Sequence, residues 1–185
     1  MQVDTFDIQG PLLFTPARHG DARGFFSETF RQDAFDAAVG PIVFVQDNHS
    51  RSTRRGVIRG LHYQAPPFAQ GKLVRVTRGA VFDVAVDIRH GSPTFGRHIT
   101  TELSEDNWRQ LWIPPGFLHG FCTLTDDVEF LYKVTAYYSR AHDGGVSPTD
   151  PDLGIQWPLN GAEPLVSDKD AKAPPLKHLP KIFSL

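Results

Sequence analysis

The stretch Val81-Phe82-Asp83-Val84-Ala85-Val86-Asp87-Ile88 decides the fold class of this chain. Side chains of two kinds alternate along it, with Phe82, Val84, Val86 and Ile88 on one face and Asp83, Ala85 and Asp87 on the other. A repeat of two residues is the side-chain period of a β-strand. The stretch therefore predicts a strand with one strongly apolar face.

Shorter runs of β-forming residues recur on both sides of this stretch, separated by many of the 16 glycines and 15 prolines. They predict further strands at 24–30, 42–46, 57–64, 72–77, 97–103, 110–113 and 128–138. A polar loop is expected between the strands at 42–46 and 57–64. Residues 30–39 carry apolar side chains at helical spacing, and Gly40-Pro41 ends that segment. About eight to ten short strands with a few short helices predict an all-β fold, a jelly-roll barrel or double-stranded β-helix.

Composition and charge are those of an ordinary soluble protein, with 40% hydrophobic and 22% charged residues and a net charge of −2. No basic patch marks a nucleic-acid or membrane partner. The single cysteine, Cys122, lies in an apolar run and is expected to be a buried packing residue. We expect one cytoplasmic domain spanning residues 1–185, because no signal peptide or membrane span is evident.

The stretch Gly56-Val57-Ile58-Arg59-Gly60-Leu61-His62-Tyr63-Gln64 places two polar side chains in a predicted strand. Strict alternation puts Arg59 and His62 on opposite faces. A bulge at Gly60 would direct both into the barrel. The alternative is a solvated surface arginine and a hydrogen-bonded core histidine, which is the commoner situation for a lone histidine in a strand.

Other chemically useful side chains lie on neighbouring predicted strands. Lys72 starts the strand after His62, so we expect it beside His62, although a lysine at a strand end is often simply exposed. Tyr132 and Tyr138 share one face of the predicted strand 128–138. A tyrosine facing His62 across a cavity is a candidate proton donor, and the alternative is core packing.

The motif Pro114-Pro115-Gly116-Phe117-Leu118-His119 resembles the second histidine motif of the cupin superfamily. Metal-binding cupins supply two more histidines and a carboxylate from an earlier motif. Here the earlier motif is His62-Tyr63-Gln64, and the next polar position is Lys72. A cation in place of a ligand argues against a divalent metal, so the sequence predicts a cupin-type barrel without a metal site.

Taken together, the motifs resemble those of the dTDP-4-dehydrorhamnose 3,5-epimerases, which are metal-free cupin enzymes. The resemblance runs nearly end to end and, besides 56–64 and 81–87, includes Gly20-Asp21-x-Arg23-Gly24-Phe25-Phe26-x-Glu28, Phe44-Val45-Gln46-Asp47-Asn48-x-Ser50, Gly71-Lys72-Leu73-Val74-Arg75, Gly91-Ser92-Pro93-Thr94-Phe95-Gly96, Gln110-Leu111-Trp112-Ile113-Pro114, His119-Gly120-Phe121, Tyr132-Lys133 and Lys169-Asp170.

The resemblance implies a cofactor-free reaction on a dTDP-linked 4-keto-6-deoxyhexose. A base removes the protons at C3 and C5, which flank the ketone, and a proton returns from the other face. His62 is implied as the base, with Asp170 as the carboxylate that orients it. Lys72 would stabilise the enolate and Tyr132 would return the proton. Asp83 would contact the sugar or support another site residue.

The resemblance also implies a set of substrate-binding residues and a homodimer. Arg59, His119 and Lys169 match positions near the diphosphate, and Gln46 and Asn48 match positions near the nucleotide. Three residues, Arg23, Phe26 and Glu28, match positions that reach the nucleotide of the neighbouring subunit, which implies exchanged N-terminal strands. The alternative for Arg23 and Glu28 is an exposed charge pair that protects an edge strand.

Three positions depart from the family pattern near the late loop. Asp143 stands where a glutamate is usual, so a carboxylate contact with sugar or nucleotide is expected to be weaker or reshaped. Tyr138 is also counted among the expected substrate-binding residues. Leu118 adds bulk next to His119, and residues 147–151 read Ser-Pro-Thr-Asp-Pro. The expected activity is 3,5-epimerisation; the alternatives are epimerisation at C3 or C5 alone, a metal cupin dioxygenase, and a non-catalytic sugar-nucleotide-binding cupin.

Overall fold

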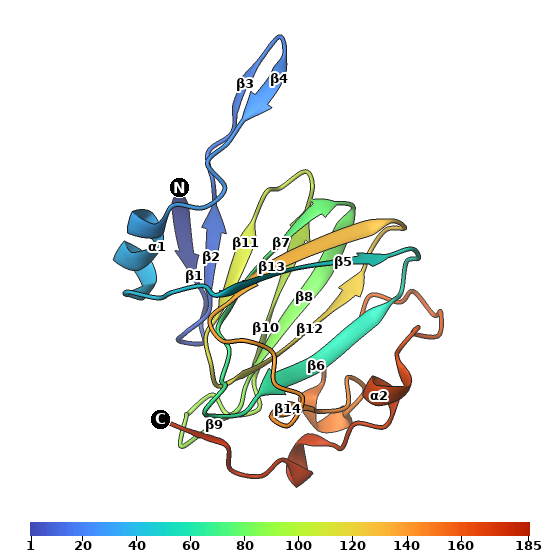
Figure 1. Ribbon diagram of the computed structural model, residues 1–185. Helices are drawn as coiled ribbons and strands as arrows, with labels where there is room; N and C mark the ends of the chain where they lie inside the picture. The colour runs from blue at the N-terminus through green and yellow to red at the C-terminus, as the bar shows by residue number, and fades with distance from the viewer.

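Two antiparallel sheets face each other in the computed structural model, which describes residues 1–185 (Figure 1). The larger sheet has six strands in the order β1 (Gln2–Thr5), β2 (Leu12–Thr15), β11 (Gln110–Ile113), β7 (Lys72–Arg78), β13 (Val128–Val134) and β5 (Gln46–Ser52). The second sheet has five, in the order β10 (His98–Ser104), β8 (Ala80–Asp87), β12 (Phe117–Thr123), β6 (Ile58–Gln64) and β14 (Asp143–Gly145). The predicted all-β barrel is confirmed.

The remaining elements lie at the periphery of these sheets. They are the hairpin β3 (His19–Asp21) and β4 (Gly24–Phe26), the parallel pair β9 (Arg89–His90) and β15 (Phe183–Ser184), the helices α1 (Gln32–Val39) and α2 (Asp168–Ala171), and the 3-10 turns η1 (Pro151–Leu153) and η2 (Leu176–His178). The β3–β4 hairpin projects away from the barrel (Figure 1). None of the helices has the length and apolar character needed to cross a lipid bilayer.

Strand β8 shows the predicted alternation, and the structure assigns its two faces. Val81 and Ala85 point into the interior between the sheets, where Phe121 and Phe130 also pack. The more apolar face, which includes Val84 and Val86, points outward. It is covered by the C-terminal segment, whose apolar residues include Val146, Leu153, Ile155, Trp157, Leu176, Leu179 and Phe183.

Helix α1 covers the outer face of the six-stranded sheet and confirms the predicted helix. Its Phe35 is 1% exposed and packs with Phe14, Leu73 and Trp112. The helix ends at Gly40, whose φ of 101° is accessible to glycine at little cost. Apolar packing of this one face holds the short helix in place.

The predicted strand at 42–46 is wrong. The strand begins at Gln46 and continues through the stretch that was expected to be a polar loop. Strand β5 is an edge strand, with Asp47, His49 and Arg51 exposed to solvent. Its alternate residues are also polar, so the strand carries no apolar alternation that a sequence pattern reveals.

Two further strands end earlier than predicted, and one strand was not predicted. The strand expected at 24–30 shortens to β4, and β13 ends at Val134 rather than at Tyr138. Beyond Val134, the side-chain amides of Gln64 and Gln70 donate to the carbonyls of residues 137 and 136, and this replaces ladder pairing. Strand β12 escaped prediction because all seven of its residues are buried, which removes the alternation between polar and apolar positions.

Candidate active site

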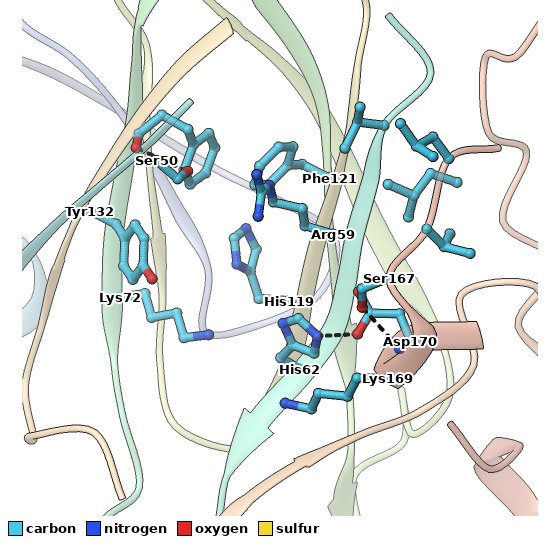
Figure 2. A pocket seen from close by; sticks show the side chains of 15 residues that line it. Ser50, Arg59, His62, Lys72, His119, Phe121, Tyr132, Ser167, Lys169 and Asp170 are labelled. Atoms are coloured by element: carbon cyan, nitrogen blue, oxygen red, sulfur yellow. Dashed lines mark hydrogen bonds and ion pairs between the residues drawn. The ribbon is translucent and has the colours of Figure 1, made fainter. Parts of the chain in front are cut away.

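A cavity of about 460 Å³ opens between the two sheets. A volume in this range accommodates a small-molecule ligand. Its polar lining includes Arg59, His62, Lys72, His119, Tyr132 and Asp170, which Figure 2 shows converging from several elements. All six were predicted as site residues from the sequence, and the structure brings them together.

Gly60 makes the cavity possible by interrupting strand β6. Its φ is 133°, and a Cβ built on it would lie 2.6 Å from the Cα of Gly120. The pairing of β12 with β6 shifts register between His119 and Phe121, opposite this point. Both Arg59 and His62 consequently line the cavity, which confirms the predicted irregularity at Gly60.

His62 forms a hydrogen-bonded pair with Asp170. Its Nε2 lies 2.7 Å from one carboxylate oxygen of Asp170, and the other oxygen accepts a hydrogen bond from the N–H of Gly60 at 3.3 Å. Burial acts to raise the pKa of Asp170, but the hydrogen bond and charge of His62, with the donors of Gly60 and Ser167, lower it overall. With Nε2 engaged, Nδ1 is the ring nitrogen left for substrate.

A second histidine–carboxylate pair lies deeper in the same sheet. His119 Nε2 is 3.0 Å from each carboxylate oxygen of Asp83, and His119 is the ladder partner of His62. Burial lowers the pKa of His119 and raises that of Asp83. The imidazole is therefore held neutral and oriented by its partner.

Lys72 and Tyr132 come from the opposite sheet, on β7 and β13. The expectation that Lys72 lies next to His62 on a neighbouring strand is wrong, because the chain crosses to the other sheet between β6 and β7, and the two residues face the cavity from different sheets. Burial lowers the pKa of Lys72 to about 8, and burial raises the pKa of Tyr132. Tyr132 therefore keeps its proton at neutral pH.

Two further positive side chains line the cavity, Arg59 and Lys169. Arg59 is anchored through Nε to the Ser52 hydroxyl and through Nη2 to the Arg51 carbonyl oxygen, each at 3.2 Å. The ammonium of Lys169 and the hydroxyl of Tyr138 both donate to the same oxygen of Asp143. This contact links α2 to β14 beside the His62–Asp170 pair.

A known protein family matches nearly the whole chain. The sequence model of the family described as dTDP-4-dehydrorhamnose 3,5-epimerase matches residues 5–178. The chain belongs to this family. A dTDP-4-dehydrorhamnose 3,5-epimerase of Shigella flexneri is 54% identical over 171 residues, which are 92% of this chain and 93% of that protein.

Solved structures agree with the family assignment. The dTDP-6-deoxy-D-glucose-3,5-epimerase of Legionella pneumophila Philadelphia 1, in complex with dTDP-4-keto-L-rhamnose, is 44% identical, and the match covers 100% of this chain and 98% of that one with a TM-score of 0.95. A 3'-monoepimerase of Streptomyces bikiniensis, in complex with dTDP-quinovose, is 39% identical, covers 93% of this chain and 86% of that one, and has a TM-score of 0.88.

Several other predicted residues do not line the cavity. Gln46 and Asn48 are on the edge strand β5, where the side-chain amide of Gln46 donates to Asn48 at 2.8 Å. Arg23, Phe26 and Glu28 lie on or just after the β3–β4 hairpin and line no part of this cavity. Phe26 is 68% exposed, an unusual position for a large apolar side chain.

Two sequence departures can also be placed. Leu118 is fully buried on the outer face of the five-stranded sheet, away from the cavity that His119 faces. Its bulk therefore does not narrow the cavity. Asp143 keeps two donors despite its short side chain. No group of three or more histidine, cysteine, aspartate or glutamate side chains is arranged to hold a metal ion.

The sequence did not reveal every residue of the cavity lining. Ser50, Phe121 and Ser167 contribute to it. Ser50 was hidden in the stretch mistaken for a loop. Ser167 carries one signal in the sequence, a helix-start spacing of three residues to Asp170, and it is the N-cap of α2 in the structure.

Proposed function

We propose that the protein catalyses epimerisation of dTDP-4-dehydro-6-deoxy-D-glucose at C3 and C5, giving dTDP-4-dehydro-L-rhamnose. The observation that carries the proposal is the placement of a carboxylate-paired histidine on one sheet and a protonated tyrosine on the other, with one cavity between them. Inversion of a carbon centre needs a base and an acid on opposite faces of the substrate. The proposal also rests on the family membership.

His62 is the base in this proposal. The ketone at C4 acidifies the hydrogens on C3 and C5, and Nδ1 of His62 removes one of them as a proton. The electron pair of the C–H bond moves onto the ketone oxygen and forms an enolate. Asp170 holds the Nε2 proton of the ring and stabilises the imidazolium.

Lys72 stabilises the negative charge on the enolate oxygen. Its side chain lines the cavity from β7, where partial burial limits its contact with water. A fixed positive group at a developing oxyanion is worth more in such a site than in water. Because its pKa is about 8, Lys72 is charged at neutral pH.

Tyr132 returns a proton from the opposite face, most clearly at C5. The C–H bond re-forms, the ketone is restored, and the configuration at carbon is inverted. Proton removal and return leave the oxidation state unchanged, so the proposed reaction uses no redox cofactor. Tyr138 lies beyond the end of β13 and is 59% exposed, which supports its assignment to the nucleotide rather than to the reacting carbons.

Arg59, His119 and Lys169 bind the diphosphate and the adjoining sugar in this proposal. Arg59 presents a planar guanidinium anchored by β5, which suits phosphate oxygens. Asp83 acts by orienting His119. The remaining nucleotide contacts are assigned to Gln46, Asn48, Tyr138 and Asp143.

The protein is further proposed to work as a homodimer with exchanged N-terminal hairpins. Arg23, Phe26 and Glu28 would then reach the nucleotide of the partner subunit. The projecting hairpin and the exposed Phe26 support this arrangement (Figure 1). The ring of Phe25 packs edge-on against Trp108, with 4.8 Å between the ring centroids, so this part of the hairpin contacts its own subunit. The neighbouring side chain, Phe26, stays exposed.

Subunit mixing tests the exchange. Arg23→Ala and His62→Ala proteins, each impaired alone, are unfolded and refolded together. If hairpins are exchanged, random pairing restores about a quarter of wild-type activity, because half the dimers gain one complete site. A mixture no more active than its components contradicts the exchange.

Solvent deuterium exchange tests the reaction itself. Wild-type protein in D₂O is expected to incorporate deuterium at both C3 and C5 of the dTDP-4-keto-6-deoxyglucose substrate. His62→Ala should abolish both exchanges while dTDP binding stays within a few-fold, and His178→Ala, a change at an exposed histidine outside the cavity, is the matched control. Deuterium at one carbon only would assign a single-position epimerase, the activity named for the Streptomyces bikiniensis relative.

A further inference from the structure

The segment that carries Asp170 is bound along strand β6. The N–H of Leu165 donates to the carbonyl oxygen of Gly56 at 2.9 Å, and the N–H of Ile58 donates to the carbonyl oxygen of Leu165 at 2.9 Å. The segment thus starts as one bridge of a parallel ladder. Two residues later, the backbone must leave this extended path to bring Asp170 back toward His62.

Ser167 lies at this change of direction. Its own backbone is extended, with φ −72° and ψ 158°, and the four residues that follow form α2. The Ser167 hydroxyl oxygen accepts a hydrogen bond from the N–H of Asp170 at 3.2 Å, and its carbonyl oxygen accepts one from the N–H of Ala171 at 2.9 Å. A helix this short gains little from its own hydrogen bonds, so the cap makes up a large part of what defines the turn.

The cap acts directly on the residue whose position matters. The backbone amide that Ser167 binds belongs to Asp170, and the Asp170 carboxylate is divided between two partners, His62 through one oxygen and Gly60 through the other. Figure 2 shows Ser167 beside Asp170 on the far side of His62 from Lys72. A small rotation of the turn would lengthen both carboxylate contacts at once.

We infer that Ser167 is a positioning residue for the proposed epimerisation. Its hydroxyl fixes the Asp170 turn, and Asp170 in turn holds His62 with Nδ1 facing the substrate. The inference rests on the proposed function for its kinetic consequence. The geometric part, that Ser167 controls the His62–Asp170 hydrogen bond, concerns the protein without substrate.

Two other roles for Ser167 make different predictions. Its side chain lines the cavity, so a direct substrate contact would raise KM when the hydroxyl is removed. A purely structural role would lower Tm and leave kcat and the His62–Asp170 hydrogen bond unchanged. A positioning role lowers kcat, leaves KM nearly constant and disturbs that hydrogen bond.

The experiment compares Ser167→Ala and Ser167→Gly, which remove the acceptor, with Ser167→Thr, which keeps one. Ser147→Ala is the matched control, since the Ser147 hydroxyl also accepts a backbone N–H two residues on, but Ser147 does not line the cavity. For each protein, kcat, KM and Tm are measured. The proton shared by His62 Nε2 and Asp170 is followed by proton NMR in the absence of substrate.

The expected result is a fall in kcat of roughly tenfold to a hundredfold for the Ala and Gly variants, with KM within about twofold. The downfield Nε2 proton signal is broadened or lost in both variants. Ser167→Thr and Ser147→Ala retain the kcat and the signal of the wild type. Glycine is well tolerated at an N-cap, so Ser167→Gly keeps the test available if the alanine variant folds poorly.

The inference is overturned if the Ala and Gly variants keep the NMR signal and kcat, or if only KM rises. Failure of the proposed function looks different. In that case the wild type itself shows no exchange at C3 or C5, while the NMR comparison still reports whether Ser167 controls the His62–Asp170 pair.

Discussion

The two histidine–carboxylate pairs of this molecule have the same chemistry and different surroundings. The side chains of His62 and Asp170 are 31% and 5% exposed, whereas those of His119 and Asp83 are 8% and 0% exposed. Asp83 directs both oxygens to one imidazole, on a neighbouring strand of the same sheet. Asp170 directs one oxygen to His62 and comes from a separate segment.

The difference separates a pair whose histidine is open to solvent from a pair that is almost completely buried. Burial works against an imidazolium at His119, where lowering of the pKa keeps the ring neutral. The His62 side chain is 31% exposed, and its partner is a carboxylate whose pKa is lowered. The proposed mechanism therefore assigns proton transfer to the His62–Asp170 pair and orientation of a binding group to the His119–Asp83 pair.

Substitution of each histidine in turn tests whether the two pairs have different roles. We expect His62→Asn to lower the rate of deuterium exchange at both carbons by at least about a thousandfold, because the general base is lost. His119→Asn should raise KM and leave exchange measurable. Rates are followed by NMR with saturating substrate. If His119→Asn is the variant without exchange, the two assignments must be reversed.

Lys72 lies opposite both pairs, and we expect Lys72→Met to slow exchange by about a hundredfold to a thousandfold, since the enolate loses its counter-charge. In the wild type, activity should fall as pH rises through about 8, where Lys72 loses its proton. A kcat/KM profile from pH 6 to 10 checks this expectation. Activity that stays level to pH 10 would contradict the assignment.

The same substitution should stabilise the fold. The pKa of Lys72 is about 8 in the folded protein and 10.5 for an ordinary lysine, so the unfolded chain binds this proton more strongly. The free energy of unfolding therefore rises with pH between about 8 and about 10.5 and carries a penalty below that range. The lowered pKa of Lys72 reduces the free energy of unfolding by at most about 3 kcal/mol, and by less because the side chain is only half-buried. Lys72→Met should raise Tm at pH 7 by a few degrees in calorimetry.

Tyr132 tests whether the acid stands opposite the base. Tyr132→Phe should leave proton removal by His62 intact, which is measured as loss of deuterium from labelled substrate. The rate of product formation should fall by about a hundredfold, because the proton donor is lost. Burial raises the pKa of Tyr132, so this residue should not produce the alkaline fall assigned to Lys72. Tyr137→Phe, a change at a tyrosine that is 65% exposed and does not line the cavity, is the control. Normal turnover by Tyr132→Phe would reduce Tyr132 to a packing residue.

The two carboxylates should separate activity from stability. Asp170→Asn is expected to lower kcat by about tenfold to a hundredfold with little change in Tm. Asp83→Asn removes a buried partner of His119 and should lower the free energy of unfolding by about 3 kcal/mol. Parallel kinetics and calorimetry on both variants provide the check. Equal effects on Tm would remove the distinction drawn between the pairs.

Leu118 is the position at which we expect the smallest effect on kcat/KM. It adjoins His119 in sequence but packs on the outer face of the sheet. Leu118→Ala should change kcat/KM by less than about threefold while lowering the free energy of unfolding by about 2–5 kcal/mol through the cavity it leaves. A large change in kcat/KM without loss of stability would place Leu118 in the site after all.

The elements predicted correctly are those whose sequence repeats report one buried face. Strand β8 and helix α1 alternate polar and apolar residues at the periods of a strand and a helix. Strand β12 is buried on both faces and strand β5 is polar on both, so neither shows a repeat. The period of a strand also says nothing about which sheet the strand joins, and for that reason Lys72 was expected beside His62 and lies across from it.

The site itself was predicted chiefly through the family resemblance. Asp170 is far from His62 in sequence, and only the tertiary fold brings them to 2.7 Å. Gly60 was the one local feature that pointed to the geometry, because a β-strand cannot direct residues 59 and 62 to one face without an irregularity. The backbone of residue 60 approaches Gly120 so closely that a Cβ atom would not fit, which explains why residue 60 is a glycine.

The C-terminal segment that covers the outer face of β8 also carries Asp170, the carboxylate that orients the base in the proposed mechanism. Packing of Leu153, Trp157 and Leu176 on the sheet and placement of Asp170 are thus parts of one docking event. During synthesis on the ribosome, the barrel strands emerge before this segment does. A nascent chain therefore holds an exposed apolar sheet and an unoriented histidine until translation passes Asp170, and catalytic competence coincides with the burial that protects the chain from aggregation and proteases.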